Sequence, residues 1–327
     1  AARALKLPMG APLPCGFFAV YDGHQGHACS EFVAKGLHMR LLKRLSAASQ
    51  APPADDKAAE RGSSAPTAAD SLDLPRLLRE AFEELDAEFL ARFRTSPDGT
   101  TAVVAVLLGA RLFVAWAGDS RCLVGERRPE RGGALAAVAV TEDHRGSLGR
   151  EAERVRGAGG EVVDIGDGAW RVARSGYEER LRELARAEQQ GLGLIGRPPV
   201  ALIVSRSFGD REFKAAGGAA GDLVTATPDV QELELSERHR YVVLMSDGLS
   251  DVMTDDEVVR FLDASLEAAA AAPEDPRADS ERLRRACGAL VAEAIRRGSD
   301  DNVTAVAVRL AWPGGDAAPP PEKRRRT

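Results

Sequence analysis

Three short acidic segments, far apart in the chain, each stand where an apolar run ends. They contain Asp22, Asp247 and Asp301. A carboxylate at the end of a buried strand is costly unless something pairs with it. Converging carboxylates also repel one another, and a hard divalent cation is the usual remedy. The sequence therefore predicts a metal site that a single fold assembles from distant segments.

Composition narrows the class of protein. The chain has 327 residues, of which 44% are hydrophobic and 29% charged, so it can form a sizeable globular core. The net charge of −6 argues against a nucleic-acid partner. No apolar run approaches the ~20 residues that a membrane helix needs, so we expect no membrane span. The four cysteines form no C-x-x-C pair, which indicates a reducing compartment and neither a disulfide framework nor a zinc site.

The hydrophobic pattern predicts an α+β fold with an antiparallel core and covering helices. Two apolar runs around Gly109 indicate a hairpin whose two faces are both covered. The expected strands are 17–21, 99–108, 112–117, 135–140, 200–205, 223–226, 241–246 and 303–310. The expected helices are 27–45, 74–94, 148–158, 176–190, 255–264 and 280–297. The Ala- and Pro-rich segments 46–71 and 268–279 are expected to be loop insertions, the first of them disordered.

The acidic segments carry a definite chemistry. Asp22 can offer a carboxylate and Gly23 a backbone carbonyl to a metal pair, to which Asp247 and Asp301 add carboxylates. Ligands that are all oxygen favour Mg²⁺ or Mn²⁺ over zinc. A water that bridges two such ions is acidic enough to attack a phosphate ester at neutral pH. His24 is placed to protonate the leaving oxygen as general acid.

Six motifs occur in a fixed order, and together they are specific. They are Asp22-Gly23-His24-x-Gly26, Gly118-Asp119-Ser120-Arg121, Thr141-Glu142-Asp143-His144, Ser205-Arg206-Ser207-Phe208-Gly209-Asp210, Asp247-Gly248-x-x-Asp251 and Asp301-Asn302. In this respect the chain resembles the metal-dependent Ser/Thr protein phosphatases of the PP2C (PPM) family over residues 16–310. The resemblance implies an α-β-β-α sandwich of two antiparallel sheets flanked by helices, with the metals at one end.

The resemblance also implies roles for individual residues. Asp22 would bridge two Mg²⁺ or Mn²⁺ ions, Gly23 would bind one of them, and Asp247 and Asp301 would complete the other. His24 would be the general acid. Asp143 and Asp251 match a weaker third metal site of the family, which they would form together with Asp247. Asp119 and Asp210 are expected to be structural.

The chain departs from the family pattern in two places. The family's N-terminal strand carries an arginine that clamps the substrate phosphate and a Glu-Asp pair near the metals, and neither motif precedes Asp22. The chain is therefore expected to be truncated at its N-terminus, with a protein that truly lacks the clamp as the alternative. Arg206 is a candidate phosphate contact, against the competing interpretation of a structural ion pair. An insertion at about 173–199 enlarges the flap, and we hypothesise that it helps to choose substrates.

We expect a single phosphatase domain over residues 1–312 that hydrolyses phosphoserine and phosphothreonine in proteins. The tail 313–327 is expected to be disordered and basic, with a nuclear address as the alternative. A monomer in the cytoplasm or nucleus, acting on phosphoprotein substrates, is expected. Two other classes remain open. One is a catalytically impaired binding or regulatory module on the same fold, and the other is a phosphohydrolase that acts on small molecules.

Overall fold

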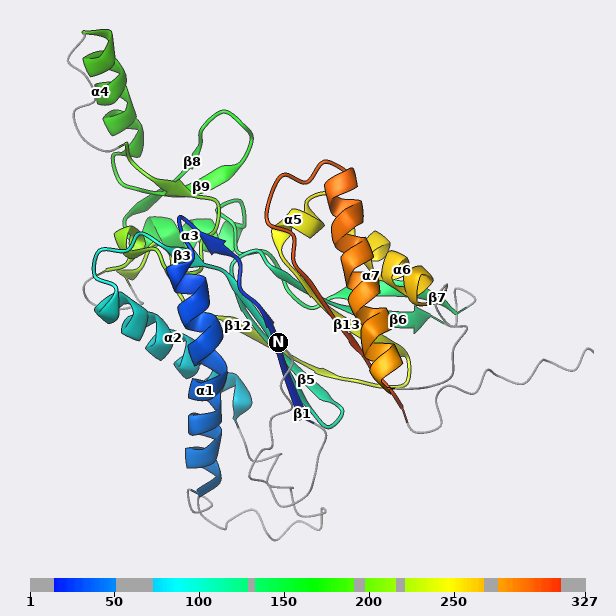
Figure 1. The fold of residues 1–327 in the computed structure, drawn as a ribbon. Coiled ribbons are helices and arrows are strands. Elements are labelled where there is room, and N and C mark those ends of the chain that lie inside the picture. The colour runs from blue at the N-terminus through cyan, green and yellow to red at the C-terminus, as the bar shows by residue number, and fades with distance from the viewer. Residues whose placement is uncertain are drawn as a thin grey trace, which may run out of the picture.

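The computed structural model describes residues 15–50, 73–128, 133–190, 198–215, 221–267 and 276–312. Two four-stranded antiparallel sheets form the centre, and helices lie on the outer face of each, as Figure 1 shows. The first sheet has the order β1 (Cys15–Val20), β4 (Ala102–Leu108), β5 (Arg111–Ala117) and β12 (Asp229–Glu234). The second has the order β14 (Ala305–Arg309), β13 (His239–Met245), β6 (Arg121–Arg128) and β7 (Ala134–Ala139). The expected α+β sandwich is confirmed.

The apolar run in β4 shows why both faces of the first sheet are covered. Successive side chains of a strand point to opposite faces. Val103 and Ala105 face the second sheet, in a cluster that includes Val242 of β13. Val104 and Val106 lie in a separate cluster with the helices. A strand buried on both sides needs a continuous apolar sequence, and β4 has one.

Four long helices cover the outer faces. α1 (Ala28–Gln50) and α2 (Leu74–Arg92) pack on the first sheet through residues such as Leu37, Phe82 and Phe89, which are fully buried. α6 (Asp255–Glu267) and α7 (Pro276–Arg296) pack on the second sheet. No helix of the described residues is long and apolar enough to cross a membrane.

Smaller elements gather at the end of the sandwich where β1 and β13 finish. β2 (Gly23–His24), β3 (Gly99–Thr100) and β11 (Phe208–Gly209) form one short sheet, followed by the 3-10 turn η2 (Arg211–Phe213). β8 (Gly160–Asp164), β9 (Trp170–Arg174) and β10 (Ala201–Leu202) form another. We call β8 to β10, with α4 (Tyr177–Gln189), the flap, and Figure 1 shows α4 extending from it away from the sandwich. α3 (Gly149–Gly157) and the short α5 (Asp247–Ser250) complete the described elements.

Several boundaries differ from the sequence-based expectation. The expected strand 223–226 is wrong, because this segment forms only a single bridge from Arg206 to Thr225. The expected strand 200–205 is shorter, since only Ala201 and Leu202 form a strand and Val204 makes an isolated bridge to Arg145. Residues 46–50 continue α1, and residues 276–279 begin α7. The expectations for 51–71, for 268–275, for the tail 313–327 and for a missing N-terminal strand concern segments outside the described residues.

Candidate active site

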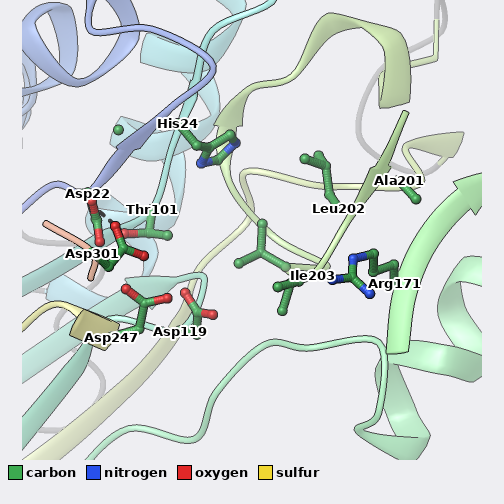
Figure 2. A pocket seen from close by; sticks show the side chains of 12 residues that line it. Asp22, His24, Thr101, Asp119, Arg171, Ala201, Leu202, Ile203, Asp247 and Asp301 are labelled. Atoms are coloured by element: carbon green, nitrogen blue, oxygen red, sulfur yellow. Dashed lines mark hydrogen bonds between the residues drawn. The ribbon is translucent and has the colours of Figure 1, made fainter. Parts of the chain in front are cut away.

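A pocket of ≈ 290 Å³ opens at the end of the sandwich where the acidic segments meet. Figure 2 shows Asp22, Asp119, Asp247 and Asp301 gathered on one side of it. The rest of its lining is Gly23, His24, Thr101, Arg171, Ala201, Leu202, Ile203 and Val204. The structure therefore brings together all the residues expected to hold the inner two ions, from segments as far apart as 22 and 301.

Backbone hydrogen bonds fix Asp22 just beyond the end of β1. Thr100 donates its hydroxyl to the Asp22 carbonyl at 2.9 Å, and the Thr101 amide donates to the same oxygen at 2.9 Å. The Asp22 amide donates to the Thr101 hydroxyl at 3.3 Å. Thr101 in turn pairs with the Ser120 hydroxyl at 2.7 Å. The two threonines thus hold the strand end and leave the Asp22 carboxylate free to face the pocket.

Asp247 and Asp301 are held next to each other by contacts between their segments. Ser246, which precedes Asp247, donates its hydroxyl to the Asn302 carbonyl at 2.9 Å. A Cβ atom on Gly248 would lie 2.6 Å from that same carbonyl, so no larger residue fits at this position without a shift. This close approach locks the start of α5 against the loop that carries Asp301.

The inner carboxylates oppose one another's ionisation. Burial, and then the charges of Asp247, Asp301 and Asp119, raise the pKa of Asp22 to about 7. Burial, followed by Asp301 and Asp251, also raises the pKa of Asp247. Oδ1 of Asp247 is buried and has no hydrogen-bond partner. An orphaned, buried carboxylate oxygen among other carboxylates is what a hard cation would satisfy.

The donor set fits Mg²⁺ or Mn²⁺ in chemistry. It consists of the carboxylates of Asp22, Asp247 and Asp301 with the Gly23 carbonyl, which are all oxygen ligands. Within the described ranges, no group of three or more His, Cys, Asp or Glu side chains lies in an arrangement that could hold an ion without other ligands. Waters and substrate oxygens complete the shell of Mg²⁺ in many proteins, so an incomplete protein cage is typical of that ion.

His24 is paired with a buried carboxylate. Its Nε2 lies 2.9 and 2.8 Å from the two carboxylate oxygens of Asp210, whose side chain is fully buried. Burial lowers the pKa of His24, but the hydrogen bond to Asp210 and the charges of Asp210, Asp119 and Asp22 outweigh it and raise the pKa. A Cβ atom on Gly99 would lie 2.2 Å from His24 Nε2, so glycine is needed beneath the pair. Asp210 thus orients His24, a contact that the sequence did not reveal.

The carboxylates expected at a third metal site bind guanidinium groups instead. Asp143 accepts two hydrogen bonds from Arg121, both at 2.8 Å. Arg145 donates to Asp119 at 3.0 Å and to Asp251 at 3.3 Å. Arg145 was not expected at the site, because a single arginine after the Asp143-His144 pair carries no periodic or motif signal.

Arg206 lies in an ion-pair network outside the pocket lining. Its Nη2 is 2.6 Å from Glu151, and its Nη1 is 2.8 Å from Asp229. Its side chain is only 11% exposed. His144 contacts Asp229 as well, at 3.1 Å, and stacks on Trp116. These contacts favour the ion-pair interpretation of Arg206 over a phosphate contact.

The flap gives the pocket an apolar wall opposite the carboxylates. Figure 2 shows Leu202, Ile203 and Arg171 on this far side. Ile203 is 39% exposed, which is unusual for a large aliphatic residue in a cleft unless something covers it. Arg171 is bound to Asp167 at 2.6 Å. The pocket therefore joins an acidic floor to an apolar side.

Comparison with known proteins gives a consistent picture. The family model described as protein phosphatase 2C matches residues 5–303. A relative from Bos taurus, "Integrin-linked kinase-associated serine/threonine phosphatase 2C", is 30% identical over 300 residues, covering 90% of this chain and 66% of its own length. "Probable protein phosphatase 2C 59" from Arabidopsis thaliana is 31% identical, with 90% of this chain and 70% of its own length covered. This chain therefore spans just under two thirds of the length of the bovine relative.

Solved structures share the fold. A serine-threonine phosphatase 2C from Toxoplasma gondii superimposes with a TM-score of 0.63 at 24% identity, covering 90% of this chain and 84% of the other. A Caenorhabditis elegans sex-determining protein also gives a TM-score of 0.63, at 25% identity, covering 95% of this chain and 61% of the other. The architecture is thus found in chains with little sequence in common.

Proposed function

Because the chain belongs to the protein phosphatase 2C family, we propose that it hydrolyses phosphoserine and phosphothreonine in proteins with the help of Mg²⁺ or Mn²⁺. The observation that carries this proposal is the convergence of Asp22, Asp247 and Asp301 on one pocket with a buried Asp247 oxygen left unpaired. When bound, two such ions would neutralise phosphate charge and make water acidic enough to attack phosphorus at neutral pH.

The protein's own groups supply the rest of the chemistry. Asp22, Gly23, Asp247 and Asp301 would hold the ions, and their fixed backbones keep that geometry before substrate arrives. Asp210 accepts the N–H of His24 at Nε2, which leaves Nδ1 to give a proton to the departing serine or threonine oxygen. No residue of the chain needs to form a bond to phosphorus. Burial raises the pKa of the Cys29 and Cys122 thiols, which suits packing and not nucleophilic attack.

The flap supports a polypeptide substrate. Ile203 lines the pocket, and Ile165 and Trp170 of the β8–β9 hairpin are 52% and 46% exposed. Apolar side chains grouped beside an active site are a surface that a peptide flanking the phosphorylated residue can cover. We place α4 and its insertion in the same role, since a second hollow of ≈ 380 Å³ lies between Tyr177 of α4 and Pro199.

The direct test is phosphate release from a phosphothreonine peptide, with and without Mn²⁺, by this chain and by the Asp247→Asn variant. We expect Mn²⁺-dependent release by the wild type only. Equal rates in the variant would refute the assignment of Asp247. Binding of the phosphopeptide without release, at any Mn²⁺ concentration, would favour the binding-module alternative. Hydrolysis of small phosphate esters but of no phosphopeptide would favour the small-molecule phosphohydrolase.

A further inference from the structure

The guanidinium of Arg145 lies among three carboxylates that come from three different segments. Its Nε is 3.0 Å from Asp119 and 3.6 Å from Asp143, and its Nη2 is 3.3 Å from Asp251. Asp119 follows β5, Asp143 follows β7, and Asp251 follows α5. The side chain of Arg145 is 28% exposed, so it is held at the site and does not extend into solvent.

Arg145 offsets part of the negative charge of the outer cluster, which we define as Asp119, Asp143, Asp251 and Arg145. Three carboxylates brought this close would repel one another without a cation. Burial opposes the charge on Arg145, but Asp119, Asp143 and Asp251 outweigh it and raise the pKa of the guanidinium. Arg121 covers the remaining edge of Asp143 with two hydrogen bonds of 2.8 Å. Arg121 and Arg145 thus bring two positive charges to three carboxylates, although burial and the charge of Asp247 still raise the pKa of Asp119 to about 7.

We propose that Arg145 is a built-in cation that occupies the place where the family resemblance implies a third metal ion, so that this chain binds two ions and not three. The inference rests on the proposed function for the two inner ions. A guanidinium has five donors in a fixed plane and suits several carboxylates at once. It is also not removed by a chelator, so the outer wall keeps its shape at any concentration of Mg²⁺ or Mn²⁺.

Arg145 is thereby a positioning residue. It contacts Asp119, which lines the pocket together with Asp247. Arg145 can therefore act on the pocket through Asp119 without contacting Asp22, Asp247 or Asp301 directly. Removing its charge while keeping its length should open the outer cluster to an ion. Arg145→Met does so, and Arg145→Lys keeps a positive charge at the same place.

The test counts Mn²⁺ ions bound at saturation, by equilibrium dialysis and by titration calorimetry, for the wild type and both variants. We expect two ions for the wild type, three for Arg145→Met and two for Arg145→Lys. Adding Asp143→Asn to Arg145→Met should return the count to two. Arg150→Met is the matched control, because Arg150 pairs with Glu142 and Asp229 and is absent from both the pocket lining and the outer cluster. Its count should stay at two.

Three ions on the wild type would overturn the inference, and this measurement needs no folded variant. An unchanged count in a folded Arg145→Met would overturn it too. The number of bound ions tests this inference, and the phosphatase assay tests the proposed function, so the two can be refuted independently. A rise from two to three ions without any peptide hydrolysis would sink the proposed function and leave this inference standing. Mn²⁺-dependent hydrolysis with an unchanged number of bound ions in Arg145→Met would support the proposed function and overturn this inference.

Discussion

Two groups of carboxylates lie side by side at the end of the sandwich, and they differ in how their charge is met. The inner group, Asp22, Asp247 and Asp301, has raised pKa values for Asp22 and Asp247 and an unpaired buried oxygen. The outer group, Asp119, Asp143 and Asp251, is bound by Arg121 and Arg145, although burial and Asp247 still raise the pKa of Asp119. The same residue type in the same fold thus serves two purposes.

The difference teaches that a carboxylate alone does not identify a metal ligand. What distinguishes the two groups is whether arginine side chains bind the carboxylates, as Arg121 and Arg145 do in the outer group. An aspartate that binds an arginine stabilises the fold without metal. A buried aspartate without a basic partner lowers the free energy of unfolding of the metal-free protein. An ion bound by the inner group should therefore raise that free energy.

The largest effect is expected from Asp247→Asn, which removes the carboxylate with the unpaired oxygen. An ion stabilises charge in the transition state by several kcal/mol, and each 1.36 kcal/mol is tenfold in rate, so we expect turnover of a phosphopeptide to fall by about a thousandfold or more. Steady-state kinetics over a range of Mn²⁺ concentrations measure this. A loss that excess Mn²⁺ fully restores would mean that Asp247 contributes affinity only.

The pair formed by His24 and Asp210 provides a third way of meeting charge, in which the imidazole lies against a buried carboxylate that raises its pKa and favours the protonated ring. General acids contribute about 10²–10⁴-fold, so His24→Ala should slow hydrolysis of a phosphothreonine peptide by about a hundredfold. An aryl phosphate has a good leaving group and should be slowed far less. Asp210→Asn should also slow hydrolysis of the phosphothreonine peptide more than that of the aryl phosphate, by a smaller factor than His24→Ala. Equal slowing of both substrates would count against the acid role.

The difference between the inner and outer groups is tested most directly by one Asp→Asn substitution in each group, with both variants measured in the absence of metal. Asp247→Asn removes repulsion among unpaired carboxylates, so we expect the metal-free protein to become more stable. Asp143→Asn removes the negative charge of the group that accepts two hydrogen bonds from Arg121. It should therefore lower the free energy of unfolding by about 2 kcal/mol. Urea unfolding in a chelator measures both free energies.

Adding Mn²⁺ then separates the groups further. The wild type and Asp143→Asn should both gain stability from the ion, whereas Asp247→Asn should gain much less. If the two variants moved in the same direction without metal, the distinction between the inner and outer groups would be lost.

Much of this site was predictable from the sequence, because its residues follow apolar strands in recognisable motifs. Asp22, Asp247 and Asp301 are brought together as expected, and so are the sandwich and most of its helices. β6 and β12 were missed, since their alternating polar residues weaken the apolar signal that marks a buried strand. The partners of Asp143 and Asp251 were also missed. Whether Arg145 points toward a carboxylate or toward solvent depends on packing between segments over 100 residues apart, as its contact with Asp251 shows.

The Glu151–Arg206 pair extends the comparison to a fully internal ion pair. Burial raises the pKa of Glu151, but the hydrogen bond and charge of Arg206 lower it to about 2 from an ordinary 4.5. A lowered pKa in the folded state stabilises the protein above pH 4.5, and that contribution is lost as the pH falls toward 2. We expect the stability difference between the wild type and Glu151→Gln to be on the order of 1–2 kcal/mol at pH 6 and to shrink toward zero near pH 2. Urea unfolding across this range measures the difference, and a difference that stays constant with pH would contradict the assignment.

The smallest effect is expected at the apolar wall, where the pocket has neither kind of charge. Ile203→Ser removes aliphatic surface that a bound peptide would cover, worth about 1 kcal/mol, so KM for a phosphopeptide should rise about fivefold with little change in kcat. KM for a small aryl phosphate should stay the same, because that substrate occupies the acidic side. Ile295→Ser is the matched control, since Ile295 is exposed on α7 and absent from the pocket lining. An equal rise in KM for both substrates would show that Ile203 shapes the inner site itself, and the division between an acidic floor for the phosphate and an apolar wall for the peptide would then be wrong.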